Sequence, residues 1–213
     1  MFGNLCVQAF SFYRPSADSP QDAPKLAFVD PLFKRRLSQI SRMTIEVVSR
    51  VKDVAPQAKI VFASYRGEIA RQVKINRGLV DDGAILPAQF SLSVFNTPPA
   101  AATIALGMKN GYSAVYPAGR SFFNAFVAAA SPVLAGSASS VLFVYADELI
   151  PDEYKAILDD EEKRAGPFAC AAVLSARQAA DGIPVPESVR TMTAEQFLSY
   201  LLAHGTPTAG AAA

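Results

Sequence analysis

Short apolar segments alternate along this chain with longer segments in which apolar residues recur at helical spacing. The apolar segments predict five strands, over 5–12, 59–64, 113–117, 141–146 and 168–176. The helical pattern predicts helices over 32–51, 68–79, 98–107, 121–134 and 197–202. Strands that alternate with helices are typical of a layered α/β domain with a largely parallel sheet.

Capping and loop residues mark the ends of these elements. The Asp30–Pro31 pair is a favourable helix start, because Asp accepts hydrogen bonds from free amides and Pro fits the first turn. Thr193 begins another helix, and the acidic stretch 151–166 predicts a short helix or a lid. The small residues at 206–213 are expected to be disordered. We therefore predict a single domain over residues 1–205.

The composition is apolar, with 51% hydrophobic and 18% charged residues among 213. This excess suits a protein that buries a broad face against a partner. Parallel strands buried on both faces would also account for it. The net charge of +1 gives no indication of nucleic-acid binding. The charge is uneven, since residues 1–110 hold 14 Lys and Arg against 8 Asp and Glu, an asymmetry that can orient a partner.

Cys6 and Cys170 both lie in apolar surroundings, where buried and inert thiols are expected. Two cysteines form neither a disulfide framework nor a zinc site, and we expect no metal and no cofactor. The N-terminus lacks the pattern of a signal peptide. No apolar run reaches the roughly 20 residues of a membrane span. A cytoplasmic location is therefore predicted.

Four motifs occur in one order and carry most of the information about function. They are FKRRLSQISRM at 33–43, FASYRGE at 62–68, FSLSVFN at 90–96 and YADE at 145–148. After the third motif, paired prolines open a small-residue helix. A short strand then leads through a sharp turn at 118–121 into a helix rich in Ala and Phe.

This series resembles the ketosynthase-like chain-length factors with a beta-ketoacyl synthase N-terminal domain, especially those of bacterial aryl polyene biosynthesis. The resemblance covers roughly residues 4–175. It implies half of a thiolase-like fold, layered α-β-α, with a mostly parallel five-stranded mixed sheet. One departure is Phe95, at a position where the family more often has His before the Asn.

In condensing enzymes of this fold, a Cys nucleophile lies on the turn between strand and helix. Matching Asn124-Ala125 to the pair that follows this turn puts Gly119 at the Cys position, and glycine cannot accept an acyl group. The catalytic histidines come from the second half of the full-length fold. The only histidine here, His204, is expected to be exposed beside the tail. The resemblance therefore implies no autonomous condensation activity.

Other catalytic patterns are weak. The chain has no G-x-S-x-G, no Walker A loop and no G-x-G-x-x-G. Asp147-Glu148 follows a strand at the edge where α/β proteins often place function, and paired carboxylates can serve acid–base chemistry. No His, Cys or metal-ligand set accompanies them in the sequence. A structural role is therefore favoured.

In the thiolase fold, equivalent strands of two subunits pair across a two-fold axis. The resemblance assigns this role, and the wall of the acyl tunnel, to one strand and its flanking aromatic segments. The residues concerned are Ser113, Ala114, Val115, Tyr116 and Pro117, with Phe95, Asn96, Pro98, Tyr112, Phe122 and Phe123 beside them. Alternatively, these aromatics fill the chain's own core. The basic run Lys34-Arg35-Arg36 is a candidate for docking an acidic acyl carrier protein, or else a solvated helix face.

The resemblance implies a non-catalytic chain-length-factor subunit. It would pair with a full-length beta-ketoacyl synthase in a type II polyketide or fatty-acid-like pathway of the aryl polyene kind, as a heterodimer or larger assembly. It would shape the acyl tunnel, stabilise its partner and meet acyl carrier protein transiently. The alternative is a homodimeric scaffold or carrier-docking module that never contacts the growing chain. An acyltransferase or hydrolase that uses Cys6 or Cys170 is the weakest interpretation.

Overall fold

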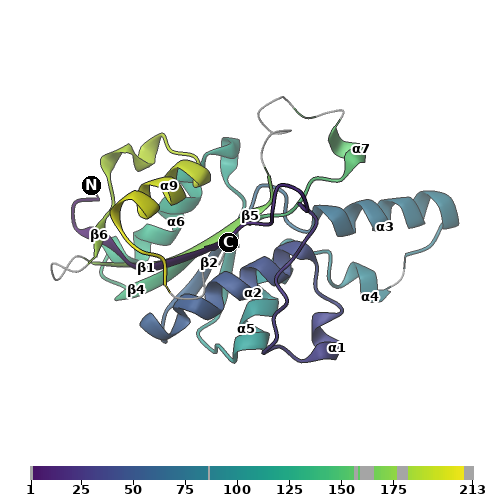
Figure 1. The fold of residues 1–213 in the computed structure, drawn as a ribbon, viewed down its shortest axis with the longest axis horizontal. Helices are drawn as coiled ribbons and strands as arrows, with labels where there is room; N and C mark the ends of the chain where they lie inside the picture. The colour runs from purple at the N-terminus through teal and green to yellow at the C-terminus, as the bar shows by residue number, and fades with distance from the viewer. Residues whose placement is uncertain (1, 86, 156–157, 159–165, 177–181, 209–213) are drawn as a thin grey trace.

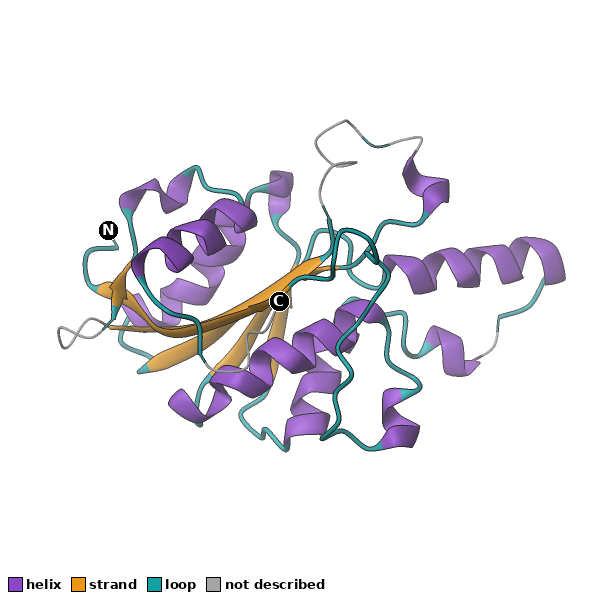
Figure 2. Ribbon diagram, in the orientation of Figure 1, coloured by secondary structure: helices purple, strands orange, loops and turns teal. Residues whose placement is uncertain are grey.

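One central sheet has helices on both faces (Figures 1 and 2). The computed structural model describes residues 2–85, 87–155, 158, 166–176 and 182–208. The strands are β1 (Leu5–Tyr13), β2 (Lys59–Ala63), β3 (Tyr112–Val115), β4 (Ser140–Asp147), β5 (Phe168–Ala176) and β6 (Ile183–Pro184). They form a six-stranded sheet in the order β3-β2-β4-β5-β1-β6.

The sheet is mixed, as the sequence predicts. β2 pairs in parallel with both β3 and β4, whereas β5 pairs antiparallel with β4 and β1. β6 pairs antiparallel with β1. Four strands therefore point one way, and β5 and β6 point the other way. The layered α/β fold class is confirmed, with six strands in place of five. β6 was missed because two residues give no apolar pattern.

Helices of two layers cover the sheet. α2 (Gln39–Val51) and α5 (Thr97–Leu106) lie on one face, and α6 (Phe122–Leu134) and α9 (Ala194–His204) lie on the other. The shorter elements are α1 (Pro31–Lys34), α4 (Pro87–Phe90), α7 (Asp152–Lys155) and three 3-10 turns at Lys52–Val54, Ala118–Arg120 and Glu187–Arg190. α3 (Ile69–Asp82) projects away from the body of the sheet (Figure 1).

The helix predicted over 32–51 is wrong as one element, because the structure contains two. Asp30 caps α1, with its carboxylate accepting from the amides of Leu32 and Phe33 at 3.0 and 2.9 Å. Ser38 then caps α2 by accepting from the Ser41 amide at 3.2 Å. A side chain that satisfies free amides starts a new helix even where apolar spacing continues. The helix predicted over 68–79 also extends further, to a left-handed cap at Gly83 with φ +67°.

Two separate apolar clusters fill the space between sheet and helices. On one face, the rings of Phe122, Phe126, Phe143 and Phe197 pack together, with centroids 5.4 to 6.2 Å apart. Aliphatic side chains of α2 cover the other face. Neighbouring residues of β4 point to opposite clusters, as the pleat of a strand requires. Both cysteines are buried and free.

The C-terminal part closes over the first cluster. Thr193 and Gln196 form a reciprocal capping box at the start of α9, which confirms the helix start read from the sequence. Beyond this helix, the Thr208 amide donates to the Phe10 carbonyl at 2.8 Å. Residues 209–213 of the predicted tail, and most of the acidic stretch 151–166, lie outside the described residues. Within the described part, no helix is long and apolar enough to cross a membrane.

We predict that Phe126→Ala lowers the free energy of unfolding by about 3–5 kcal/mol, because it removes a ring at the centre of the aromatic cluster. Phe126 is fully buried against Phe2, Phe122, Phe143 and Phe197. Urea unfolding measures the change. Ile104→Ala is the control, since Ile104 is 68% exposed and should change stability by less than about 0.5 kcal/mol. Equal effects of the two variants would contradict the packing described.

Candidate functional site

The turn after β3, residues 117–121, is called the elbow here. Gly119 lies at its exposed tip with φ +62° and ψ +21°, a left-handed conformation that favours glycine. A Cβ built on Gly119 would meet no atom within 4 Å, so the space around it is open. The side-chain Nδ2 of Asn124 donates to the Ala118 carbonyl at 3.0 Å and fixes the turn to α6. The elbow thus has the strand–turn–helix form that the sequence predicts, with no side chain at its tip.

β3 is the last strand on its side of the sheet, and we call residues 112–116 the β3 edge. Among the described residues, no strand pairs with its outer side. Tyr116 is 59% exposed and its ring lies edge-on to the half-buried Phe95 at 6.4 Å. Asn96 donates to the Tyr112 hydroxyl at 3.2 Å. The edge therefore offers backbone groups, aromatic surface and a polar pair to a neighbour.

The structure divides the predicted interface residues into two groups. Ser113, Ala114 and Val115 are half-buried at the edge, whereas Pro98, Pro117 and Phe122 are buried. Phe122 is 2% exposed and contacts the rings of the aromatic cluster, so it fills this chain's own core. Phe123 is half-buried, 5.9 Å from Phe2, with the Arg190 guanidinium 5.5 Å from its ring centroid. Contact of either ring with a partner's tunnel stays a prediction.

The predicted carrier-docking run also divides. The Lys34 ammonium donates to the carbonyls of Lys25 and Leu26, at 3.0 and 3.4 Å, and so helps to hold its own loop. Arg35 and Arg36 are exposed, and neither forms an ion pair among the described residues. Two cations of the three therefore remain available to a docking partner.

The groups that could act as nucleophile or base are poorly placed. Burial raises the pKa of the Cys170 thiol to about 12, so little thiolate exists at neutral pH. His204 is exposed on α9, where its ring stacks on Tyr200. Within the described part of the chain, no three His, Cys, Asp or Glu side chains could together hold a metal ion.

Three buried carboxylates, here called the carboxylate cluster, lie at the carboxyl ends of β2 and β4. Asp147 accepts from the hydroxyls of Ser64 and Tyr145, at 2.7 and 2.5 Å. The same side chain accepts from the amides of Tyr65 and Arg66 at 3.1 and 3.0 Å. Asp147 thus fixes the turn that follows β2 to the end of β4.

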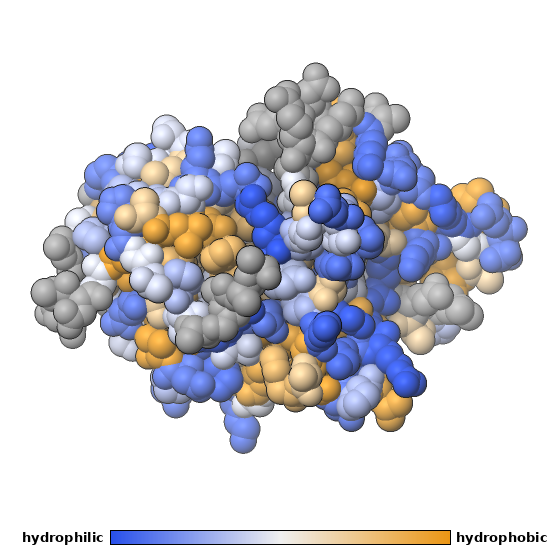
Figure 3. Space-filling view, viewed as in Figure 1, coloured by the Kyte–Doolittle hydropathy of each residue, from blue (hydrophilic) through white to orange (hydrophobic). Residues whose placement is uncertain are grey.

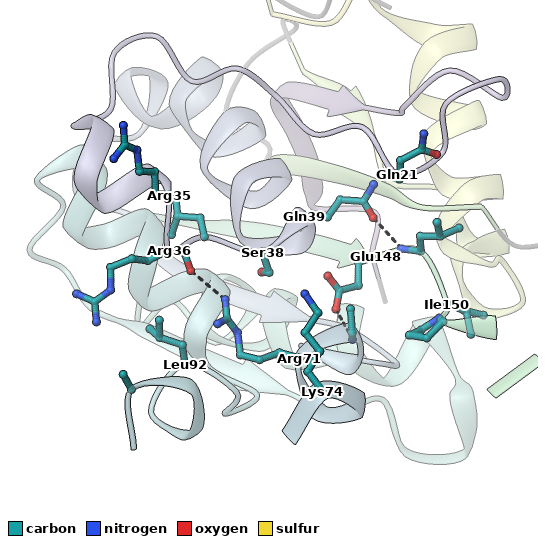
Figure 4. A pocket seen from close by; sticks show the side chains of 15 residues that line it. Gln21, Arg35, Arg36, Ser38, Gln39, Arg71, Lys74, Leu92, Glu148 and Ile150 are labelled. Carbon is teal, nitrogen blue, oxygen red and sulfur yellow. Dashed lines mark hydrogen bonds between the residues drawn. The ribbon is translucent and has the colours of Figure 1, made fainter. Parts of the chain in front are cut away.

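Glu148 and Glu68 complete the cluster. Glu148 accepts from the Ala70 amide at 2.9 Å (Figure 4) and from the Ile40 amide at 3.5 Å, so one side chain binds the first turns of both α3 and α2. Glu68 accepts from the Ser38 and Ser41 hydroxyls at 2.7 Å each, and pairs with Arg71 at 3.3 Å. Negative groups are stabilising at helix N-termini. The structural role favoured for Asp147-Glu148 agrees with these contacts.

Sequence reasoning missed Glu68 as part of this cluster, along with Ser38, Ser41 and Ser64. Each had a local signal, since these residues come just before or just after the start of a helix or the end of a strand. No pattern in one sequence indicates that positions 27 to 83 residues apart would meet. The tertiary pairing of β2 with β4 brings them together.

Burial dominates the protonation of the cluster. It raises the pKa of Asp147, although hydrogen bonds from Tyr145 and Ser64 oppose the change. Burial also raises the pKa of Glu148 from 4.5 to about 7, opposed by the hydrogen bond from the Ala70 amide. Between pH 4.5 and about 7, Glu148 therefore keeps its proton in the folded state, whereas in the unfolded state it has lost that proton. The free energy of unfolding therefore falls as pH rises through this interval.

We predict that Glu148→Gln removes about 3 kcal/mol of this fall between pH 4.5 and 8. Gln has no proton to lose, and its carbonyl oxygen can still accept from the Ala70 amide. Urea unfolding at a series of pH values measures the slope. Glu195→Gln, at a half-exposed position on α9, should leave the slope unchanged. A wild-type slope in Glu148→Gln would contradict the burial of an ionisable group at this position.

The fold and the elbow together define a ketosynthase-like class of protein. The family model for the beta-ketoacyl synthase N-terminal domain matches residues 12–198. The chain belongs to this family. A comparison with curated proteins finds no significant match.

Solved structures share the fold. A ketosynthase (ApeO) in complex with its chain length factor (ApeC) from Xenorhabdus doucetiae matches with a TM-score of 0.69 and 22% identity, over 88% of this chain and 89% of that chain. The ishigamide ketosynthase/chain length factor matches with a TM-score of 0.61 and 12% identity, over 85% of this chain and 64% of that chain. A beta-ketoacyl synthase from Burkholderia phymatum matches with a TM-score of 0.62 and 11% identity, over 82% of this chain and 59% of that chain. The chain thus spans about three fifths of the latter two chains.

Proposed function

We propose that this protein is a non-catalytic chain-length-factor subunit that pairs with a full-length ketosynthase. The observation that carries the proposal is the open β3 edge, next to an elbow with glycine at its tip. An unpaired strand is a template for pairing with another chain. The similar structures include complexes of a ketosynthase with its chain length factor, which supports this choice of partner.

The elbow supports a non-catalytic role. Gly119 offers no nucleophile, and the buried Cys170 and the surface His204 offer no replacement at the elbow. Condensation requires a nucleophile and groups that polarise the thioester, held in one geometry. The chemistry would therefore belong to the partner's Cys and histidines.

Exposed apolar residues support a broad partner-binding face. Val94 is 43% exposed beside Phe95, and Phe90 is 57% exposed on α4. At the projecting end of α3, Leu79 and Val80 are 50% and 82% exposed, and the surface view shows apolar residues there (Figure 3). Exposed apolar residues are typical of interaction sites where they lie together. They add to the apolar composition, to which the two buried clusters also contribute.

In this proposal, the aromatic pair Phe95 and Tyr116 forms part of the wall of the partner's acyl tunnel. The growing chain stops fitting when its end meets the wall, and the partner's chemistry converts this steric limit into product length. The pathway would be of the type II polyketide or fatty-acid-like kind that makes aryl polyenes. Arg35 and Arg36 would attract an acidic carrier protein to the assembly.

The second candidate is a homodimeric scaffold or carrier-docking module. The same open β3 edge favours it, because two copies of one strand can pair with each other across a two-fold axis. The two candidates differ in whether a ketosynthase is required at the edge.

We predict that the chain co-purifies from its native host with a ketosynthase that has an intact Cys elbow and both histidines, in a fixed ratio by native mass spectrometry. Tyr116→Asp should weaken this complex at least about tenfold, because it puts a charge on the edge. Leu202→Asp is the matched control, since Leu202 is 43% exposed on α9. A stable homodimer without ketosynthase would sink the proposal and leave the scaffold.

We also predict that Tyr116→Trp shortens the product of the reconstituted assembly, because a larger ring moves the tunnel wall inward. Mass spectrometry of the released chains measures the length, and Leu202→Trp is the control. Unchanged length in an intact complex would favour docking without contact to the growing chain.

A further inference from the structure

A cavity of about 700 Å³ lies beside the carboxylate cluster, and no residue of the elbow or of the β3 edge lines it. Its lining comes from the junction of α1 and α2, the first turns of α3, residues near α4 and the segment after β4. This size is typical of small-molecule sites. Its position beyond the carboxyl end of β4 is where open α/β sheets commonly bind ligands. Size and position indicate a ligand-binding site, and the lining residues indicate which class of ligand it binds.

The walls of the cavity are mainly apolar. Leu37, Leu92 and Ile150 line it, together with Leu149, Pro151, Ala70 and Ala88. The polar groups at its inner end are Gln39 and Glu148 (Figure 4). Gln39 is fully engaged, since it accepts from the Leu149 amide and donates to the carbonyls of Pro20 and Asp22. The walls therefore suit the apolar body of a ligand rather than a sugar or a peptide.

Cations without partners surround this apolar space. Arg35, Arg36 and Lys74 line it, and none of them forms an ion pair with any described residue. In the close view, the Lys74 ammonium points into the cavity toward Glu148, and the guanidinium groups of Arg35 and Arg36 lie at its outer margin (Figure 4). Arg71 differs, because it is held by Glu68 and by the Arg36 carbonyl. Positive charge is thus present both inside and at the mouth.

The backbone amides of Ile40 and Ala70, at the helix N-termini beside the cavity, are not free to bind an anion. The amides of Ile40 and Ala70, which would otherwise attract an anion, already donate to Glu148. Any anion here must be held by side chains, with Lys74 the best placed. That makes the lysine the residue on which binding can be tested.

We propose that this cavity binds an amphiphilic anion, a carboxylate or phosphate head group on a chain of mainly apolar atoms. Lys74 contacts the head group, the two arginines attract it, and Leu37, Leu92 and Ile150 pack against the chain. A free acyl acid has this chemistry. The phosphorylated pantetheine arm of a carrier protein shares the anionic head group, but its two amides do not match the apolar walls. The site itself does not rest on the proposed function.

Protonation of Glu148 should modulate the binding. Burial raises the pKa of this carboxyl to about 7, so below that pH it does not repel an anion. The charged groups near it are Glu68 and Arg71 at the start of α3, and Lys74, which lines the same cavity. Affinity is expected to fall as pH rises from 6 to 8, and Glu148→Gln should abolish this fall.

The test is titration of the full chain with decanoate and with pantetheine 4′-phosphate, followed by isothermal calorimetry and by amide chemical shifts. Lys74→Ala should weaken binding about tenfold, because a charged hydrogen bond is lost. Lys59→Ala is the matched control, with an exposed lysine at the opposite end of β2. The shifts should concentrate at Ala70, Lys74 and Leu92.

Decanoate is expected to bind more tightly than pantetheine 4′-phosphate, because its chain is apolar throughout. The reverse order would overturn the proposal. Failure of decanoate to bind below about 1 mM would also overturn it, as would equal affinities of Lys74→Ala and Lys59→Ala. These results are independent of complex formation with a ketosynthase. A chain that pairs with a ketosynthase but binds neither probe would leave the proposed function intact and refute only this site.

Discussion

Three buried carboxylates hold the carboxyl ends of β2 and β4 against the first turns of α2 and α3. Asp147 binds the turn after β2, Glu148 binds two helix starts at once, and Glu68 binds the serines that begin α2. Removing a buried charge from such a network leaves several donors without partners, which is costly. The position of the projecting α3, and hence the cavity beside it, depends on these contacts.

The outer edge of the same sheet has the opposite character. The carboxylate cluster satisfies its polar groups internally, whereas β3 leaves one side of its backbone unpaired and Tyr116 largely exposed. The contacts that stabilise the fold and the surface open to a partner therefore lie on different strands of the sheet. In the proposed function, a partner covers this edge, and Gly119 at the tip of the elbow supplies no nucleophilic side chain.

Apolar spacing predicted the five longer strands and the layered fold, because burial on a sheet leaves a direct mark on the sequence. The same spacing predicted α1 and α2 as one helix, because the Ser38 cap starts a new helix while the apolar pattern continues. It missed β6, whose two residues are defined only by pairing with β1. Among candidate site residues, Gly119 and Tyr116 lie at the surface, whereas long-range packing buries Phe122, and no local pattern distinguishes the two groups. The cavity is likewise a product of tertiary contacts alone.

The central claim is that the β3 edge receives a ketosynthase. Hydrogen–deuterium exchange at the amides of residues 112–116, measured for the chain alone and for the chain mixed with its co-purifying ketosynthase, tests it most directly. Strand pairing across the interface predicts strong slowing of exchange at these amides, with no change at α9 on the far side of the sheet. Unchanged exchange at the β3 edge within a stable complex would contradict the account.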